Sequence, residues 1–191
     1  AYRLDQGVWF YTQDCAATEK THGDYTVIAT WFRVPGGPLA LMRIDRVQYD
    51  APRVLDLMQR RYNEHEELFW IEKNGVGLPI IQMARRKGLP VKELEAHKDK
   101  VSRAEGVTPM MAEGWFLLPH SAPWLGKLEK EMLSFPNAAH DDQVDAIVYG
   151  CQVWQRSRRR SMIRRQRDEE LAARPVFDSG VTPARGVAWT T

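Results

Sequence analysis

The chain has 191 residues, of which 43% are hydrophobic and 27% are charged, and its formal net charge is +2. This composition excludes a disordered protein, and the small net charge excludes a polycation that binds nucleic acid through bulk charge alone. Two cysteines exclude a disulfide framework, and no apolar run approaches the roughly 20 residues of a membrane helix.

The first part of the chain predicts three strands and a helix. Residues 8–14 are rich in aromatic and β-branched types and end on Asp14. Residues 25–34 and 39–49 form two more apolar runs, separated by a proline- and glycine-containing turn. Because the connections are short, we expect an antiparallel meander, followed by an amphipathic helix over 51–65.

The next part predicts a parallel crossover. Residues 68–72 are a compact apolar run that ends on Glu72, a glycine-containing turn follows, and a helix over 78–87 ends at Gly88. Residues 90–94 predict a fifth strand.

The second half is predicted to be mainly helical. Residues 98–113 form a basic stretch that we expect to be helical and broken near Gly106 and Pro109. A short extended piece over 115–118 precedes an amphipathic helix over 124–135.

The last predicted helix carries the densest group of acids. Pro136 and Asn137 predict its start, and an apolar stripe recurs at helical spacing over Val144, Ile147, Val148, Cys151 and Trp154. Asp141, Asp142 and Asp145 fall within its first turns. Buried carboxylates this close repel one another, so we expect something positive beside them. The alternative is a solvated acidic first turn, which contributes about 0.3–1 kcal/mol per charge through the helix dipole.

The chain is expected to divide into a domain over 1–160 and a charged, poorly ordered tail over 161–191. The arginine-dense run over 156–167 is interpreted as a solvated helix end, with binding of DNA or an acidic partner as the alternative.

The separated acids are expected to form one site. If the first and fourth strands are parallel neighbours, Asp14 and Glu72 lie at the same sheet edge, where ligands of α/β sheets bind. Converging carboxylates are hard oxygen ligands that suit Mg²⁺ or Mn²⁺. Two such ions about 3.5–4 Å apart can activate water and clamp a scissile phosphate.

Five segments in order, WFYTQDCAATEKTHGDYTVIATW, FWIEKNGVG, DKVSRA, MAEGWFLLP and SFPNAAHDDQVDAIVYG, resemble the carboxyl-terminal nuclease domain of the large terminase subunit of tailed bacteriophages. The resemblance implies an α/β, ribonuclease-H-like fold, related to Holliday-junction resolvases, with a central mixed sheet of five or more strands flanked by helices. It also implies metal-dependent cutting of concatemeric double-stranded DNA during genome packaging, in the bacterial host cytoplasm during phage assembly.

Carried over residue by residue, the resemblance implies catalytic and metal-binding roles for five acids. Asp14, Glu72 and Asp142 rank first and Asp145 and Asp141 next, since the pattern acid-x-x-acid-Ala falls on Asp142 and Asp145 while Asp141 is expected to lie nearer the sheet. His140 either orients a water or a carboxylate, or is a structural residue near the helix cap.

Basic residues interleaved with the acids are candidates for DNA phosphate contacts: Lys20, Lys73, Lys98, Lys100 and Arg103. Gly75 and Gly77 either let the backbone approach a phosphate or a metal ligand, or simply form the turn into a helix.

Partners follow from the resemblance. No G-x-x-x-x-G-K-[ST] phosphate loop is present, so we expect the packaging ATPase to lie in an amino-terminal domain absent from this chain, which begins at Ala1 without methionine. The portal and the small terminase subunit are further implied partners, and no membrane is expected. Alternatives to the endonuclease are a resolvase-like nuclease, a non-catalytic module that binds DNA or a packaging partner, and a structural cation site.

Overall fold

The computed structural model describes residues 4–16, 25–34, 36–95, 99–138 and 140–172. By internal contacts the chain divides into two units, Ala1–Arg158 and Arg159–Thr191. The sheet and all the predicted acidic site residues belong to the first unit.

A six-stranded mixed sheet forms the centre of the first unit, in the order β5-β4-β1-β2-β3-β6. The pairs β1–β2 and β2–β3 are antiparallel, while β1–β4, β4–β5 and β3–β6 are parallel. The predicted meander, crossover and mixed sheet of five or more strands are thereby confirmed. The strands are β1 (Val8–Asp14), β2 (Thr26–Arg33), β3 (Leu39–Val47), β4 (Phe69–Glu72), β5 (Val91–Leu94) and β6 (Phe116–Leu117).

The helices follow the predicted order and flank the sheet. A short 3-10 turn, η1 (Leu4–Gln6), precedes β1. The α-helices are α1 (Ala51–His65), α2 (Gly77–Arg86), α3 (Lys100–Glu105), α4 (Thr108–Ala112), α5 (Leu125–Ser134) and α6 (Asp142–Ala172).

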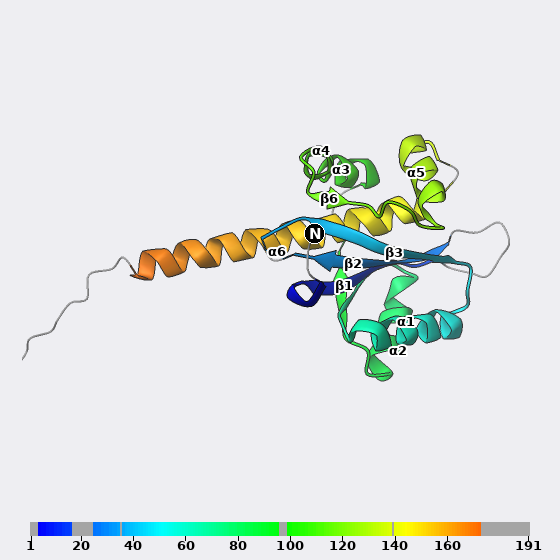
Figure 1. Cartoon of the computed structure of the whole chain (residues 1–191). Helices are drawn as coiled ribbons and strands as arrows, with labels where there is room; N and C mark the ends of the chain where they lie inside the picture. The colour runs from blue at the N-terminus through cyan, green and yellow to red at the C-terminus, as the bar shows by residue number, and fades with distance from the viewer. Residues whose placement is uncertain (1–3, 17–24, 35, 96–98, 139, 173–191) are drawn as a thin grey trace, which may run out of the picture. The chain divides into compact units, whose positions relative to one another are not determined.

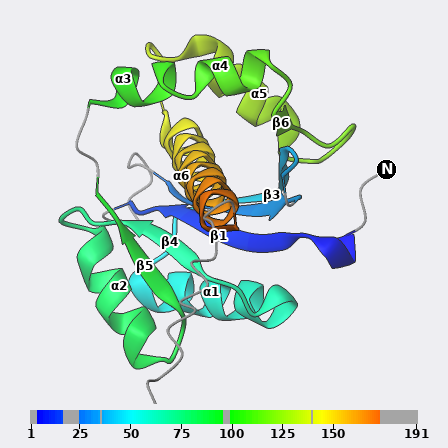
Figure 2. The ribbon, with the colours of Figure 1, turned by 90° about the vertical axis from the view of Figure 1, so that its left-hand side faces the viewer.

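Alternating side chains of the strands build two separate cores. Tyr11 and Ile28 face the side covered by α1 and α2, whereas Phe10, Ala29 and Trp31 face α6. Figure 2 shows α1 and α2 on one face of the sheet and α6 on the other. Because successive side chains of a strand point to opposite faces of the sheet, the position of a residue in its strand determines which helices it packs against.

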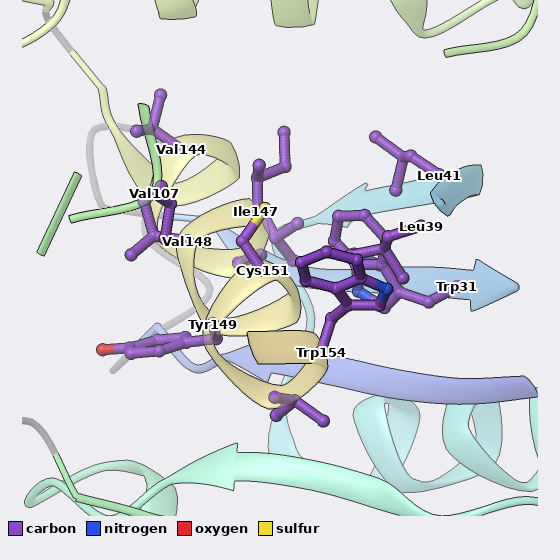
Figure 3. Packing of buried hydrophobic residues seen from close by; sticks show 14 of the residues in the cluster. Trp31, Leu39, Leu41, Val107, Val144, Ile147, Val148, Tyr149, Cys151 and Trp154 are labelled. Atoms are coloured by element: carbon purple, nitrogen blue, oxygen red, sulfur yellow. The ribbon is translucent and has the colours of Figure 1, made fainter. Parts of the chain in front are cut away.

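The predicted apolar stripe of α6 is buried in the core that also contains Trp31 and Leu39 of the sheet and Val107, Met110 and Leu128 of the segment from α3 to α5. Figure 3 shows Trp154 beside Trp31, Val144 and Val148 beside Val107, and Tyr149 extending away from both groups. One buried hydroxyl fixes the helix to the sheet, because Trp31 Nε1 donates to Thr12 Oγ1 (2.8 Å) and Thr12 Oγ1 donates to the Ala146 carbonyl (2.7 Å).

The start of α6 differs from the prediction. The helix begins at Asp142, not after Asn137, and its first N–H groups are capped from another helix. Glu131 Oε1 of α5 accepts from the backbone N–H of Gln143 (2.7 Å) and of Val144 (3.1 Å). A cap that is distant in sequence replaces the local asparagine cap, so the acids lie at the first helical residues.

The 98–113 stretch is helical and broken near Gly106 and Pro109, as predicted. Helix α3 ends at Glu105, and α4 begins at Thr108 with Pro109 in its first turn, where proline needs no N–H partner. Within the second unit, α6 continues to Ala172, with an i,i+4 pair between Arg165 and Glu169 at 3.0 Å. The predicted tail beyond residue 172 lies outside the described residues.

Among the residues that the structure describes, no helix combines the length and the apolar character that crossing a membrane requires.

Gly150 tests the packing of α6 on the sheet. A Cβ at this position would lie 2.2 Å from the indole ring of Trp31, which is fully buried. We expect Gly150→Ala to lower the free energy of unfolding by about 1–3 kcal/mol through overpacking, and the melting temperature by about 2–4 °C per kcal/mol. Thermal unfolding monitored by circular dichroism measures this.

Gly126 in α5 is the matched control, because nothing lies within 4 Å of its Cβ position. Gly126→Ala should leave the melting temperature unchanged or raise it, since alanine favours the helix by up to about 1 kcal/mol. Equal effects of the two substitutions would show that Trp31 does not constrain α6.

Candidate functional site

Asp14 and Glu72 lie at adjacent strand ends, as predicted. The parallel register pairs Gln13 of β1 with Ile71 of β4, which places the two acids one residue further on at the same sheet edge. Alternation puts both on the α6 face, since Thr12 bonds the Ala146 carbonyl of α6 and Trp70 packs against the α6-side core.

The start of α6 adds two buried acids to this edge. Asp142 and Asp145 are only 5% and 4% exposed. The side chain of Asp141 is 30% exposed, so the expectation that it lies nearer the sheet is wrong. Asp141 lies just before the first residue of α6, Asp142. Its carbonyl accepts a hydrogen bond from Asp145 N, and its side chain pairs with Lys100.

The carboxylates act on one another electrostatically. Burial raises the pKa of Asp14 well above its ordinary value, and the charges of Asp145, Glu72 and Asp142 raise it further. Burial also raises the pKa of Asp145, although hydrogen bonds and charge from Lys100 and Arg103 partly offset this. The two strand ends and the helix therefore converge on one acidic centre.

Two cations of α3 neutralise part of this centre. Lys100 Nζ lies 2.7 Å from Asp141 Oδ1 and 2.7 Å from Asp145 Oδ2. Arg103 is buried and places Nη2 2.9 Å from Asp145 Oδ1 and Nη1 3.4 Å from Glu72 Oε1. Both oxygens of Asp145 thus have a cationic partner, which is the positive charge that the sequence required.

Two residues that hold Glu72 were missed by the sequence analysis. Asn74 Nδ2 donates to Glu72 Oε2 at 2.9 Å. Arg103 Nη1, which also reaches Glu72, donates to the hydroxyl of Tyr149 at 2.6 Å. Asn74 lies in the glycine-containing turn that the sequence analysis noted, whereas Tyr149 was given no role there, so only Asn74 had a sequence signal.

The turn after Glu72 explains one of the two glycines. Asn74 Oδ1 accepts from the backbone N–H groups of Val76 (3.0 Å) and Gly77 (2.6 Å). A Cβ on Gly77 would lie 2.0 Å from the Glu72 carbonyl oxygen, while Gly75 has open space around it. Gly77 is therefore required by the close turn into α2, which is the structural alternative considered for it.

The other predicted basic positions lie in different surroundings. Lys73 Nζ pairs with Glu93 Oε2 of β5 at 2.9 Å, away from the acidic centre. Lys20 and Lys98 lie outside the described residues. His140 packs edge-on against Tyr25, and Arg46 stacks over the same ring while its Nη2 lies 3.9 Å from Asp142 Oδ2.

The donor set of this acidic centre fits a hard divalent cation in its chemistry. All its acidic groups are carboxylates, and an added cation would relieve the repulsion that raises the pKa of Asp14. Within the described ranges, no three Asp, Glu, His or Cys side chains stand close enough together to hold an ion. In the present arrangement Lys100 and Arg103 supply the positive charge.

A sequence model of the terminase RNaseH-like domain matches residues 11–152. The chain belongs to this family. The match covers the second half of β1, the strands β2 to β6 and the acid-bearing start of α6. The expected ribonuclease-H-like α/β fold of a terminase nuclease domain is confirmed.

Solved structures agree with this terminase fold. Crystal structures of the large terminase nuclease from thermophilic phage G20c, with bound cobalt and with bound magnesium, give TM-scores of 0.64 and 0.63, each at 15% identity. Each match covers 79% of this chain and 83% of that chain. At this identity the likeness concerns the fold alone. Comparison with curated protein sequences gives no match.

The raised pKa of Asp14 makes a prediction for this terminase domain. The folded protein binds the Asp14 proton more tightly than the unfolded chain does. The protonated carboxyl therefore contributes its full stabilisation below pH 3.8, the ordinary pKa, and this stabilisation is lost as the pH rises through the pKa of the folded state. Without metal, Asp14→Asn should therefore raise the melting temperature at neutral pH. The rise in melting temperature should be on the order of 3 °C, because a change of about 1 kcal/mol in the free energy of unfolding shifts the melting temperature by that amount in a domain of this size.

Melting curves in EDTA across a pH series measure the effect, and the gap should close at acid pH. Asp56→Asn is the control, because Asp56 is an exposed acid of α1 whose side chain is 61% accessible. A lower melting temperature for Asp14→Asn at neutral pH would contradict the electrostatic account.

Proposed function

We propose that this terminase domain is a metal-dependent endonuclease that cuts concatemeric double-stranded DNA during viral genome packaging. The observation that carries the proposal is the convergence of Asp14 and Glu72, from two adjacent strand ends, with Asp142 and Asp145 of α6. Mg²⁺ or Mn²⁺, as two ions, would be held by these four acids, with Asp141 at the margin. The G20c nuclease structures with bound magnesium and cobalt support metal binding.

Divalent cations bound there would supply an activated water and stabilise the leaving oxygen of an in-line displacement. The protein's own groups position the carboxylates. Arg103 holds Asp145 and Glu72 at a fixed separation, and Asn74 holds the second oxygen of Glu72. Because Asp142 and Asp145 are buried, they have little freedom to turn towards solvent.

The remaining partners are proposed from the family. We infer a packaging ATPase domain, the portal and the small terminase subunit as partners, and the bacterial host cytoplasm as the place of action. The match to the terminase RNaseH-like domain supports DNA as the substrate.

Plasmid cleavage tests the proposed reaction. Supercoiled plasmid should be nicked or linearised with Mn²⁺ or Mg²⁺ and left intact in EDTA. Asp14→Asn and Glu72→Gln should each reduce the rate at least about 100-fold, the scale for loss of one electrostatic catalytic group. Asp56→Asn, on α1, is the matched control and should cut at the normal rate.

Other outcomes would favour the alternatives. Full cleavage activity in both Asp14→Asn and Glu72→Gln would contradict the proposal. Preferential cutting of four-way junctions would favour a resolvase-like nuclease. Intact DNA binding without cleavage in any metal would favour a non-catalytic module. A metal-induced rise in melting temperature without strand breaks would favour a structural cation.

Lys100 makes a separate prediction about metal binding. Both oxygens of Asp145 have cationic partners, and Lys100 is the more replaceable one because its side chain is 49% exposed, against 6% for Arg103. Lys100→Met should lower the melting temperature in EDTA, since the acids lose a countercharge. It should also tighten Mn²⁺ binding about tenfold, equivalent to roughly 1.4 kcal/mol.

Mn²⁺ titration followed by calorimetry measures this affinity without requiring turnover. Lys87→Met is the matched control, because Lys87 is 46% exposed and pairs with one carboxylate, Asp56, at 3.1 Å away from the site. Equal Mn²⁺ affinity in the wild type and Lys100→Met would show that Lys100 does not compete with the metal.

A further inference from the structure

A groove runs between β3 and α5 beside the start of α6. Two adjoining hollows of about 700 and 270 Å³ share Arg46, Lys127 and Gln143 as lining residues, so they form one continuous depression. We call it the β3–α5 groove and define it by the basic residues Arg43, Arg46, Lys127 and Lys130 and the aromatic residues Tyr25 and Trp124. In Figure 1, α5 lies near the beginning of α6.

Two of the four basic residues of this groove are the lysines of α5, whereas Arg43 pairs with Asp45 at 3.1 Å and Arg46 lies 3.9 Å from Asp142. Lys127 and Lys130 are three residues apart on α5, so they project from the same side of the helix, and both are exposed. Neither lies within 4.0 Å of a carboxylate oxygen in the described part of the chain. The acid that lines the groove, Glu131, is 7% exposed, and its oxygens accept from Gln143 and Val144.

Two buried polar atoms at the groove lack a partner among the described residues. They are Nε of Arg46 and Nδ1 of His140, both in side chains that line the hollows. Buried polar groups are normally hydrogen-bonded, so their isolation indicates that a polar ligand or water completes them. Both side chains also contact Tyr25, which fixes them in place.

The groove adjoins the acidic centre. Arg46 Nη2 lies 3.9 Å from Asp142 Oδ2, and Gln143, the next residue of α6, lines both hollows. A ligand in the groove therefore lies next to the carboxylates that are proposed to cut. This continuity favours the substrate itself over an unrelated partner as the occupant.

We propose that the β3–α5 groove binds the phosphodiester backbone of the DNA substrate where it leaves the acidic centre. The inference rests on the proposed nuclease function and adds a location for the substrate that the predicted lysines did not include. Unpaired lysines and a guanidinium suit phosphate oxygens, and the aromatic rings of Trp124 and Tyr25 suit sugars or unstacked bases. An acidic protein segment would match the positive charge of the groove, but it would not explain why the groove adjoins the acidic centre.

DNA binding in the absence of cleavage tests this proposal. The double variant Lys127→Ala/Lys130→Ala is compared with the wild type by fluorescence anisotropy, with a short labelled blunt duplex in EDTA over a salt series. Loss of two phosphate contacts should weaken binding about tenfold and reduce the slope of log affinity against log salt by about 2.

The matched control is Arg86→Ala/Lys87→Ala, which removes the same charge from exposed positions at the carboxyl end of α2, on the opposite face of the sheet. It should leave the salt slope unchanged. In cleavage assays the groove variant should raise KM more than it lowers kcat, since the groove binds the substrate and does not touch the reacting phosphate.

The two proposals fail separately. An unchanged affinity and slope in the groove variant overturns the groove, even if Asp14→Asn abolishes cleavage. A reduced slope supports the groove, even if the wild type never cuts. A poly-glutamate peptide is the second probe: if the groove variant loses the peptide and keeps DNA, the occupant is an acidic protein and the proposal is overturned.

Discussion

Repulsion among carboxylates at one sheet edge is the constraint on which the rest of this structure depends. Partial burial of Asp14, together with the charges of Asp145, Glu72 and Asp142, raises its pKa. Lys100 and Arg103 offset this repulsion only in part. The carboxylate cluster lowers the stability of the folded protein, and the same repulsion favours the binding of a cation from solution.

The fold holds this unfavourable group together through contacts outside it. Parallel pairing of β1 with β4 brings two strand ends to one edge, and the hydroxyl of Thr12 joins β1 to α6 through the Ala146 carbonyl. Glu131 of α5 then fixes the first turn of α6. These contacts are uncharged or fully satisfied, so they supply the rigidity that the acids themselves cannot.

Much of the fold and part of the site could be predicted from the sequence. Alternating and helical periodicities located the strands and helices, and strand-end acids together with β1–β4 pairing predicted that Asp14 and Glu72 meet. The start of α6 was misplaced because its cap, Glu131, is distant in sequence and resembles any other acid of an amphipathic helix. Arg103 and Lys100 read as DNA contacts, since sequence spacing does not show that their side chains turn inward to the acids.

The alternation of side chains along β1 and β4 has a consequence for how such a chain can diverge. Asp14 shares its face with Thr12, and Glu72 shares its face with Trp70, while the intervening residues pack under α1 and α2. Substitutions do not change which face of the sheet a residue lies on. An insertion or deletion of one residue within either strand would turn the acid to the opposite face, so changes in length are tolerated only in the connections between strands.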